Sequence, residues 1–226
     1  MIEVLGVKKR YRKKHVLSDV SFTAKKGEIT CLIGLNGTGK STILKGIMGL
    51  TPFDAGHVLI DGKPIDLSRV AFVPDHSTFP IQFTIEQCEA FMIDFYPTFD
   101  RSLFARLVEA FKLFPEDKLN ELSKGTLAKV NLALGIAQDP EYILLDEPFS
   151  GIDVFSKEQI VELFSSDVME GRGVLITTHE IEDIEYLIDK AVMLNNGRII
   201  REFDVEDVRF IHGKSIVDVM REEYGA

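Results

Sequence analysis

A glycine-rich loop between an apolar run and a helical stretch constrains this sequence more than any other feature. Residues Gly34–Ser41 read Gly-Leu-Asn-Gly-Thr-Gly-Lys-Ser and fit the pattern GxxxxGK[ST] in full. The preceding run Ile29–Ile33 has the continuous apolar character of a buried parallel strand, and a helix is expected from about Ser41 to Met48. A strand, a phosphate-binding loop and a helix in this order predict a parallel α/β core.

The residue types in this loop are those that binding of a nucleotide's phosphates requires. Glycines let the backbone N–H groups converge on phosphate oxygens, and the following helix directs its positive end at the same anion. The Lys40 ammonium can reach the outer phosphates, and the Ser41 hydroxyl can ligate Mg²⁺. The nucleotide-binding residues predicted here are Gly34, Asn36, Gly37, Thr38, Gly39, Lys40, Ser41 and Thr42.

An apolar run that ends in two carboxylates supplies the second part of such a site. Tyr142–Leu145 is followed directly by Asp146 and Glu147. Asp146 is expected to hold Mg²⁺, usually through water, and Glu147 to polarise the attacking water or accept its proton. Together with the loop, this pair predicts a nucleotide hydrolase.

Composition excludes several other classes of protein. The chain has 226 residues, and 26 basic against 36 acidic side chains give a net charge of −10, which argues against duplex nucleic acid as the main partner. Cys31 and Cys88 form no CxxC pair and are expected to be reduced, apolar thiols of a cytosolic protein. No apolar run approaches the roughly 18–20 residues of a membrane span. The sequence therefore predicts a soluble chain that reaches a membrane only through another subunit.

Periodicity places further elements around these motifs. Near the N-terminus, strands at 2–7 and 20–24 are expected on either side of the basic run Lys8–Lys14, which we interpret as a solvated hairpin edge. A mostly helical insertion is expected at about 83–138, with Thr84 and Gln87 as a capping box at its start. Asn196-Gly197 predicts a hairpin. Helices are expected at about 101–114, 126–138, 156–169 and 181–188, and in a short tail at about 204–226.

Three further motifs occur in a fixed order along the chain. Leu122–Gly125 opens the helix before Asp146, Ser150–Asp153 follows the carboxylates, and His179 ends the apolar strand 173–178. With the loop and the carboxylates, these motifs resemble the ATPase subunit of ATP-binding cassette (ABC) transporters, from about residue 2 to residue 203. The variant motifs are most similar to those of bacterial exporters. This resemblance implies a P-loop NTPase core with an N-terminal antiparallel β region, in one domain over residues 1–226.

The resemblance also implies roles for individual residues. Tyr11 is similar to the aromatic residue that stacks on adenine, and His179 to the residue that senses the γ-phosphate, so the implied catalytic residues are Lys40, Glu147 and His179. Ser123 and the Gly125 N–H stand at a helix N-terminus, which is a ready site for an anion. In the family that anion is the γ-phosphate held by the other subunit, so two chains enclose two ATP molecules.

Three positions depart from the family pattern, and one of them is Thr126, which stands where the signature usually ends in glutamine. A glutamine usually follows the strand at Val70–Val73, where it contacts the metal site and the membrane subunit, but here Asp75 follows Pro74. Asp75 is therefore a candidate metal ligand beside Ser41 and Asp146. Lys124 stands where glycine is commoner; it either adds positive charge towards the phosphate or is a solvated surface lysine.

The implied function is Mg²⁺-dependent ATP hydrolysis that drives separate membrane-spanning permease subunits. The chain is expected to form a homodimer or to pair with a related ATPase subunit, at the inner face of the cell membrane. Phenylalanines of the insertion are expected in its core, and a few at its edge, with Phe79 and Phe83, could form a socket for a partner's helix. One alternative is a membrane-associated scaffold of the cell-division type. Another is an ABC-type ATPase that acts on nucleic acid or ribosomes, although no nucleic acid is expected.

Overall fold

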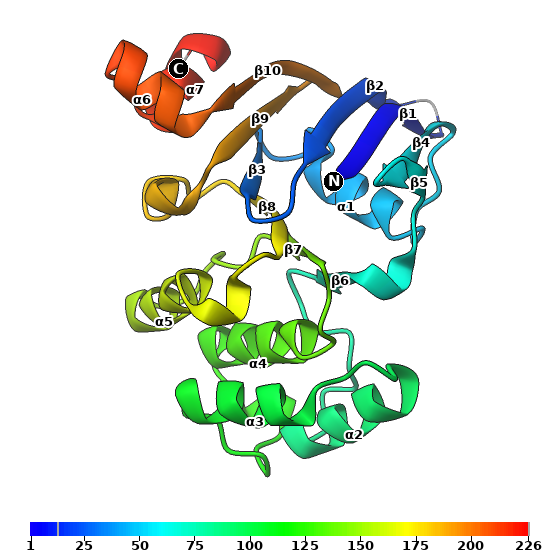
Figure 1. Cartoon of the computed structure of the whole chain (residues 1–226), viewed down its shortest axis with the longest axis vertical. Coiled ribbons are helices and arrows are strands. Elements are labelled where there is room, and N and C mark those ends of the chain that lie inside the picture. The colour runs from blue at the N-terminus through cyan, green and yellow to red at the C-terminus, as the bar shows by residue number, and fades with distance from the viewer. Residues whose placement is uncertain (13, 226) are drawn as a thin grey trace.

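Two β-sheets and a group of helices build the chain in the computed structural model, which describes residues 1–12 and 14–225 (Figure 1). The larger sheet carries the phosphate-binding loop at the end of its third strand. Five of its strands are parallel and β10 pairs antiparallel with β9. Its order is β10 (Arg198–Asp204), β9 (Lys190–Asn195), β3 (Ile29–Ile33), β8 (Gly173–Thr178), β7 (Tyr142–Asp146) and β6 (Val70–Val73). The predicted parallel α/β core is confirmed.

The smaller sheet is antiparallel, as expected for the N-terminal region. Its order is β2 (Lys14–Ala24), β1 (Ile2–Tyr11), β4 (Ala55–Ile60) and β5 (Lys63–Pro64). The prediction that Lys8–Lys14 separates two short strands is wrong: Lys8 pairs with Ser18 and Arg10 with His15, so both strands run into the basic segment. Asp54 holds this part of the strand, because its carboxylate accepts from the Arg10 backbone N–H at 2.7 Å and from the charged Lys9 Nζ at 3.4 Å. Lys13 lies outside the described residues.

Helices cover both faces of the larger sheet. In Figure 1, α2 (Ile85–Phe95), α3 (Arg101–Ala110) and α4 (Lys124–Ile136) form one group away from the smaller sheet, as predicted for the helical insertion. Thr84 with Gln87 forms the predicted capping box at the start of α2. Asp100 and Ser123 are the N-caps of α3 and α4, and each accepts a backbone N–H of the first turn. The other helices are α1 (Lys40–Ile47), α5 (Val154–Phe164), α6 (Val205–His212) and α7 (Ile216–Tyr224). Short 3₁₀ turns are η1 (Leu67–Arg69), η2 (Leu119–Glu121), η3 (Asp167–Met169) and η4 (Glu185–Leu187).

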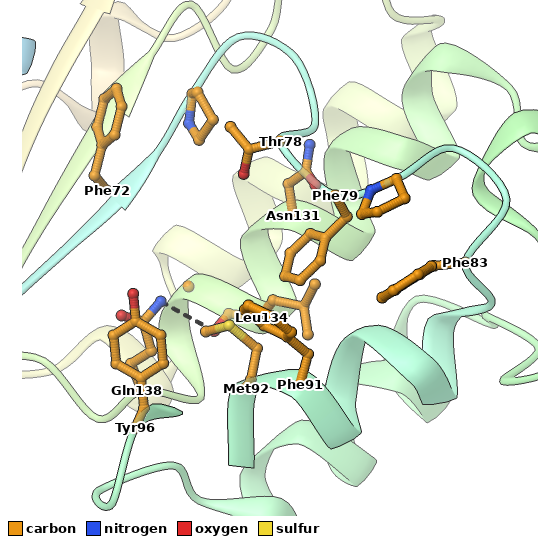
Figure 2. Close-up of a pocket in the computed structure, with 13 residues that line it drawn as sticks. Phe72, Thr78, Phe79, Phe83, Phe91, Met92, Tyr96, Asn131, Leu134 and Gln138 are labelled. Atoms are coloured by element: carbon orange, nitrogen blue, oxygen red, sulfur yellow. Dashed lines mark hydrogen bonds between the residues drawn. The ribbon is translucent and has the colours of Figure 1, made fainter. Parts of the chain in front are cut away.

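The phenylalanines of the insertion divide into two groups. Phe99, Phe104 and Phe111 are buried, as predicted for its core. Phe91, 42% exposed, instead lines a groove of ≈ 310 Å³ between the insertion and the end of β6. Figure 2 shows the groove, in which the Phe79 ring meets the Phe91 ring edge-on at 5.6 Å. Phe95 and Phe114 are exposed, so the prediction that they belong to the core is wrong.

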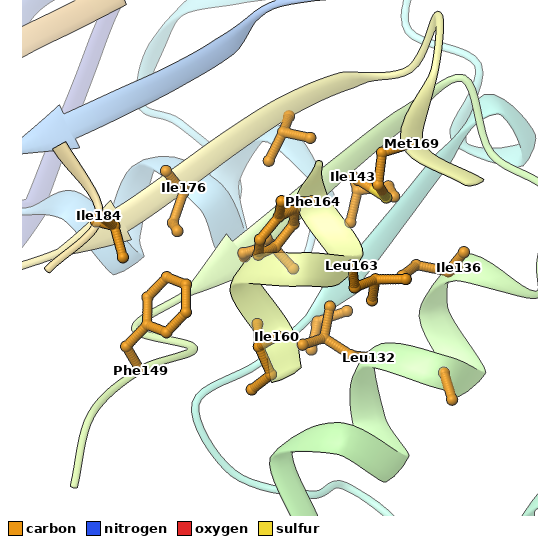
Figure 3. Packing of buried hydrophobic residues seen from close by; sticks show 14 of the residues in the cluster. Leu132, Ile136, Ile143, Phe149, Ile160, Leu163, Phe164, Met169, Ile176 and Ile184 are labelled. Carbon is orange, nitrogen blue, oxygen red and sulfur yellow. The ribbon is translucent and has the colours of Figure 1, made fainter. Parts of the chain in front are cut away.

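Alternating residues of β3 divide the core into two clusters, one on each face of the larger sheet. Cys31 and Ile33 point to the side of α4 and α5, whereas Leu32 points to α1 and the smaller sheet. On the first side, Figure 3 shows Phe149 and Phe164 among aliphatic side chains of α4, α5 and β8. Both cysteines are free and buried, as predicted. The two clusters fix the base of the phosphate-binding loop from both sides.

Two predicted helices are shorter than expected, and a third is absent. The one expected at 101–114 ends at Ala110, because Lys112 adopts a left-handed conformation at φ 54°. The one expected at 156–169 ends as α5 at Phe164 and is followed by η3. In place of the helix expected at 181–188, a turn and η4 bury Ile181, Ile184 and Ile188 through i→i+3 hydrogen bonds. None of the helices in the described part of the chain is long and apolar enough to cross a membrane.

Candidate active site

One cleft collects most of the residues predicted to bind nucleotide. It has a volume of ≈ 380 Å³ and lies where the phosphate-binding loop faces the hairpin of the smaller sheet. Tyr11, 46% exposed, comes from the end of β1, and the Lys9 ammonium lies 5.5 Å from its ring centre. The lining residues are Tyr11, Val16, Asn36, Gly37, Gly39, Lys40, Ser41, Thr42 and Glu147. Both sheets therefore contribute to one cleft.

The loop depends on glycine where it turns into α1. Gly39 has φ 112°, and a β-carbon there would stand 2.7 Å from Leu17 Cδ2, so a larger residue would be strained and would clash. The unpaired N–H groups of the first turn of α1 follow directly and give the cleft a positive end. Gly34 and Thr38 do not line the cleft; the Thr38 hydroxyl closes the loop by donating to the Leu35 carbonyl at 2.8 Å.

Ser41 and Asp146 meet although 105 positions separate them. The Ser41 hydroxyl donates to Asp146 Oδ1 at 2.8 Å, and the Thr177 hydroxyl donates to the same oxygen at 2.8 Å. Asp146 is 1% exposed because parallel pairing of β7 with β8 buries the end of its strand. These contacts orient the carboxylate towards the first turn of α1.

Lys40, Glu147 and His179 form a second connected set beside this pair. Lys40 Nζ donates to the Gly34 carbonyl at 2.8 Å and lies 3.6 Å from Glu147 Oε1. The other Glu147 oxygen contacts His179 Nδ1 at 2.8 Å and accepts the His179 backbone N–H at 3.2 Å. The three predicted catalytic residues are thus brought together. Lys40 is only 6% exposed, so its charge is balanced inside the site.

The backbone of Glu147 is held in an uncommon conformation. Its φ is 51°, in the left-handed region that a glutamate seldom adopts. The Thr177 carbonyl and hydroxyl both accept the Glu147 N–H, at 2.9 and 3.1 Å. On β3, burial first and then the Glu147 charge raise the pKa of Cys31, so that thiol stays protonated. Strain at one carboxylate, compensated by local hydrogen bonds, is typical of functional sites.

Ser123 and Gly125 lie at a different place on the chain's surface. Ser123 is the exposed N-cap of α4, and Gly125 is buried in the first turn of the same helix. Neither residue lines the cleft. A β-carbon on Gly125 would stand 2.4 Å from the Ser156 hydroxyl, so glycine allows α4 to pack tightly against the start of α5.

Asp75 lies in exposed surroundings. It follows β6 and Pro74, and its carboxylate contacts the Nδ1 of His76 at 2.5 Å. The side chains of Asp75 and His76 are 48% and 74% exposed. Pro74 before it and Thr78 after it line the groove of Figure 2, so the Asp75 segment borders that groove.

The oxygen ligands around Ser41 suit Mg²⁺ bound together with a nucleotide. The Ser41 hydroxyl and the Asp146 carboxylate are hard donors 2.8 Å apart, and Mg²⁺ takes one or two protein oxygens while the substrate's phosphates and waters supply the rest. In the described residues, no group of three or more His, Cys, Asp and Glu side chains forms a metal site of its own. The donors therefore fit a metal that arrives with the substrate.

Sequence reasoning missed two residues of the site. Thr177 fixes both Asp146 and Glu147, and Val16 lines the cleft opposite the loop. Thr177 could have been found from the sequence, because it is a polar residue at the end of the apolar run before His179. Val16 carries no such signal, because its place depends on the pairing of β1 with β2.

Comparison with known proteins agrees with this geometry. The family model described as ABC transporter matches residues 17–150. The ABC transporter ATP-binding protein YtrB of Bacillus subtilis is 34% identical over 196 residues, 84% of this chain and 67% of that protein. The manganese transport system ATP-binding protein MntB of Listeria innocua is 31% identical over 201 residues, 83% of this chain and 84% of that protein.

Solved structures extend the likeness to the whole fold. An ATP-binding subunit of an ABC transporter superposes with a TM-score of 0.86 at 28% identity, covering 98% of both chains. The dimeric cassette MJ0796, in a post-hydrolysis state with ADP and Pi, superposes with a TM-score of 0.79 at 26% identity, covering 90% of this chain and 98% of that one. This chain therefore belongs to the ABC transporter family and is an ATP-binding, ATP-hydrolysing subunit of that family.

Proposed function

We propose that the subunit hydrolyses Mg²⁺-bound ATP in a head-to-tail dimer and thereby drives separate membrane-spanning permease subunits. In this proposal residues 1–226 act as one ATPase domain, held at the membrane by the permease. The observation that carries the proposal is that Lys40, Glu147 and His179 converge beside the Ser41–Asp146 pair, at a cleft that Lys40, Ser41 and Glu147 line.

Each residue of the cleft has a distinct chemical task in this proposal. Lys40 leaves the Gly34 carbonyl and binds the outer phosphates, while Tyr11 stacks on the adenine. Ser41 and Asp146 would hold Mg²⁺, which offsets negative charge on the phosphates when bound. Glu147 accepts a proton from the attacking water, and His179 keeps its carboxylate in place.

The dimer is supported by the position of the α4 N-terminus. Ser123 is an exposed N-cap and Gly125 follows it, buried, in the first turn of α4, and neither residue lines the cleft of its own chain. The N–H groups of such a helix start are suited to an anion. In a head-to-tail dimer each chain supplies this helix start to the partner's γ-phosphate. The dimeric MJ0796 cassette shows that a chain of this fold associates in pairs.

Complementation between two inactive variants tests this arrangement. Lys40→Ala disables the cleft and Ser123→Arg blocks the helix start, so each variant alone should lose hydrolysis. In an equal mixture, half of the dimers contain one site with an intact cleft and an intact opposing helix. Up to about a quarter of wild-type activity should then return. A mixture no more active than its components would contradict the head-to-tail arrangement.

The apolar groove supports a permease contact. Its walls come from the end of β6, α2 and α4, and it exposes aromatic surface that a helix of a partner can cover. Phe91→Asp should abolish co-purification with the permease and leave the hydrolysis rate of the isolated subunit within twofold. Phe114→Asp is the matched control, since Phe114 is 60% exposed and does not line the groove. Equal permease capture by both variants would place the contact elsewhere.

A further inference from the structure

A partly buried lysine at the start of α5 holds two carboxylates next to the catalytic histidine. Lys157 is 16% exposed, and its Nζ donates to Glu180 Oε2 at 2.7 Å and to Asp183 Oδ2 at 2.6 Å. Partial burial alone would lower the pKa of Lys157, but its hydrogen bonds to Asp183 and Glu180 outweigh burial and raise that pKa. The lysine therefore stays charged and fixes the segment that follows His179.

Glu180 connects this lysine to the catalytic set. Its other oxygen, Oε1, lies 4.0 Å from His179 Nε2, while His179 Nδ1 contacts Glu147 at 2.8 Å. The His179 imidazole thus lies between the carboxylates of Glu147 and Glu180. Lys157 is paired with Glu180 and not with Glu147. The Glu180 N–H also donates to the Thr178 hydroxyl at 3.0 Å, which fixes the backbone at this turn.

The same turn of α5 also touches the start of α4. Asp153, the N-cap of α5, accepts from the Ser156 N–H at 3.0 Å and from the Ser156 hydroxyl at 2.7 Å. That hydroxyl packs against Gly125, where no β-carbon would fit. The Lys157 N–H donates to the Asp153 carbonyl at 3.0 Å, so Lys157 belongs to the same hydrogen-bonded turn.

We propose that Lys157 is a positioning residue that couples the start of α4 to the catalytic pair Glu147 and His179. By neutralising Glu180, it keeps that carboxylate from drawing the imidazole away from Glu147. Lys157 does not line the nucleotide cleft, so its loss should affect turnover and spare binding. In the proposed dimer, on which this last step rests, α4 serves the partner's ATP while His179 serves its own. The first turn of α5 then links the two ATP sites within one chain.

The experiment compares Lys157→Met with Lys190→Met in the full chain. Lys190 is the matched control. It is 13% exposed and ion-paired with Glu202, but it is the first residue of β9 and does not line the nucleotide cleft. Lys157→Met should lower the kcat of basal ATP hydrolysis about tenfold with KM for ATP within about twofold. Lys190→Met should keep kcat within twofold of the wild-type value. Lys157→Arg, which keeps the positive charge, should recover most of the kcat that Lys157→Met loses. Equal kcat for the two methionine variants would overturn the proposal.

A double-mutant cycle covers the case in which Lys157→Met is poorly folded. Glu180→Gln keeps the size of the side chain and removes the charge that Lys157 balances. If Lys157 acts through Glu180, adding Lys157→Met to Glu180→Gln should change kcat by less than about twofold, whereas independent roles would multiply the losses. A multiplicative result would overturn the proposal. The dimer is tested separately by complementation, so failure of either idea is distinguishable.

Discussion

Replacing Glu147 with glutamine should separate ATP binding from ATP hydrolysis. The side chain is 17% exposed and accepts the His179 backbone N–H, a contact that a glutamine oxygen can keep. Its backbone φ of 51° costs glutamine no more than glutamate, so the local fold should persist. Only the negative charge and its basicity are removed.

The size of the effect follows from the contacts of Glu147. Loss of a positioned general base costs about 10²- to 10⁴-fold in kcat, or about 3 to 5 kcal/mol of activation free energy. At 3.6 Å from Lys40, an attraction between unit charges is worth about 4 to 5 kcal/mol at an effective dielectric constant of ~20. Lys40 no longer has to leave a carboxylate to reach the phosphates. If about a third of that energy reappears in binding, ATP affinity should rise about tenfold.

Tighter binding without hydrolysis should trap the dimer. At an ATP concentration about 100 times Kd, binding favours the associated state by about 2.7 kcal/mol for each site. Gel filtration with light scattering should show a mass of twice 25.4 kDa for Glu147→Gln with ATP, and 25.4 kDa after Ser123→Arg is added. A Glu147→Gln protein that binds ATP and stays at the monomer mass, with its permease absent and present, would refute the reasoning.

Other perturbations test separate parts of the chain. Lys40→Ala should reduce ATP hydrolysis at least about 100-fold, because it removes the cation proposed to bind the outer phosphates. A wild-type rate in a phosphate-release assay would exclude that role. Asp75→Gln should weaken the Mg²⁺ dependence of hydrolysis or change the stimulation of hydrolysis by the permease, while binding of a fluorescent nucleotide survives. If neither the Mg²⁺ titration nor the stimulation changes, Asp75 is a surface residue without such a role. The folded chain should lose stability as the pH falls from about 5 to 2. Hydrogen bonds from Arg69 and Lys26 lower the pKa of Glu141 to about 2. Hydrogen bonds from the N-terminal amine and Arg69 likewise lower the pKa of Asp61 to about 2. Both carboxylates bind fewer protons in the folded chain than in the unfolded chain. Their contribution to the free energy of unfolding is therefore complete above the unfolded pKa near 4 and is lost as the pH falls to about 2. Urea unfolding over this range should show a shallower decline of the free energy of unfolding for Glu141→Gln than for wild type.

The parts of the fold that sequence could predict are those set by local chemistry. Thr84, Asp100 and Ser123 begin helices because their side chains accept a backbone N–H two or three residues on, which is a local preference. The phosphate-binding loop and its neighbouring strand are specified in the same way by glycines and an unbroken apolar run. The carboxylate pair could likewise be predicted, since a buried strand ends there.

The parts that escaped prediction depend on distant partners. The basic segment became strand because Asp54, more than 40 positions away, accepts from Lys9 and Arg10. The spacing of Ile181, Ile184 and Ile188 predicted a helix, but the backbone there makes i→i+3 hydrogen bonds, from Ile184 to Ile181 and from Ile188 to Glu185. The role of Thr177 was hidden for the same reason, because it becomes visible only when β7 and β8 pair.

Both sheets contribute residues to the cleft, so a bound nucleotide should also affect how readily the protein opens and is proteolysed. In the proposed complex, adenine at Tyr11 and phosphates at Lys40 would together hold the smaller sheet against the larger one, since both residues line the cleft. Any opening that parts the sheets must first release the ligand, so bound nucleotide lowers the population of protease-sensitive conformations in proportion to its occupancy. A subunit with an empty cleft should therefore be cut by a protease faster than one that holds nucleotide.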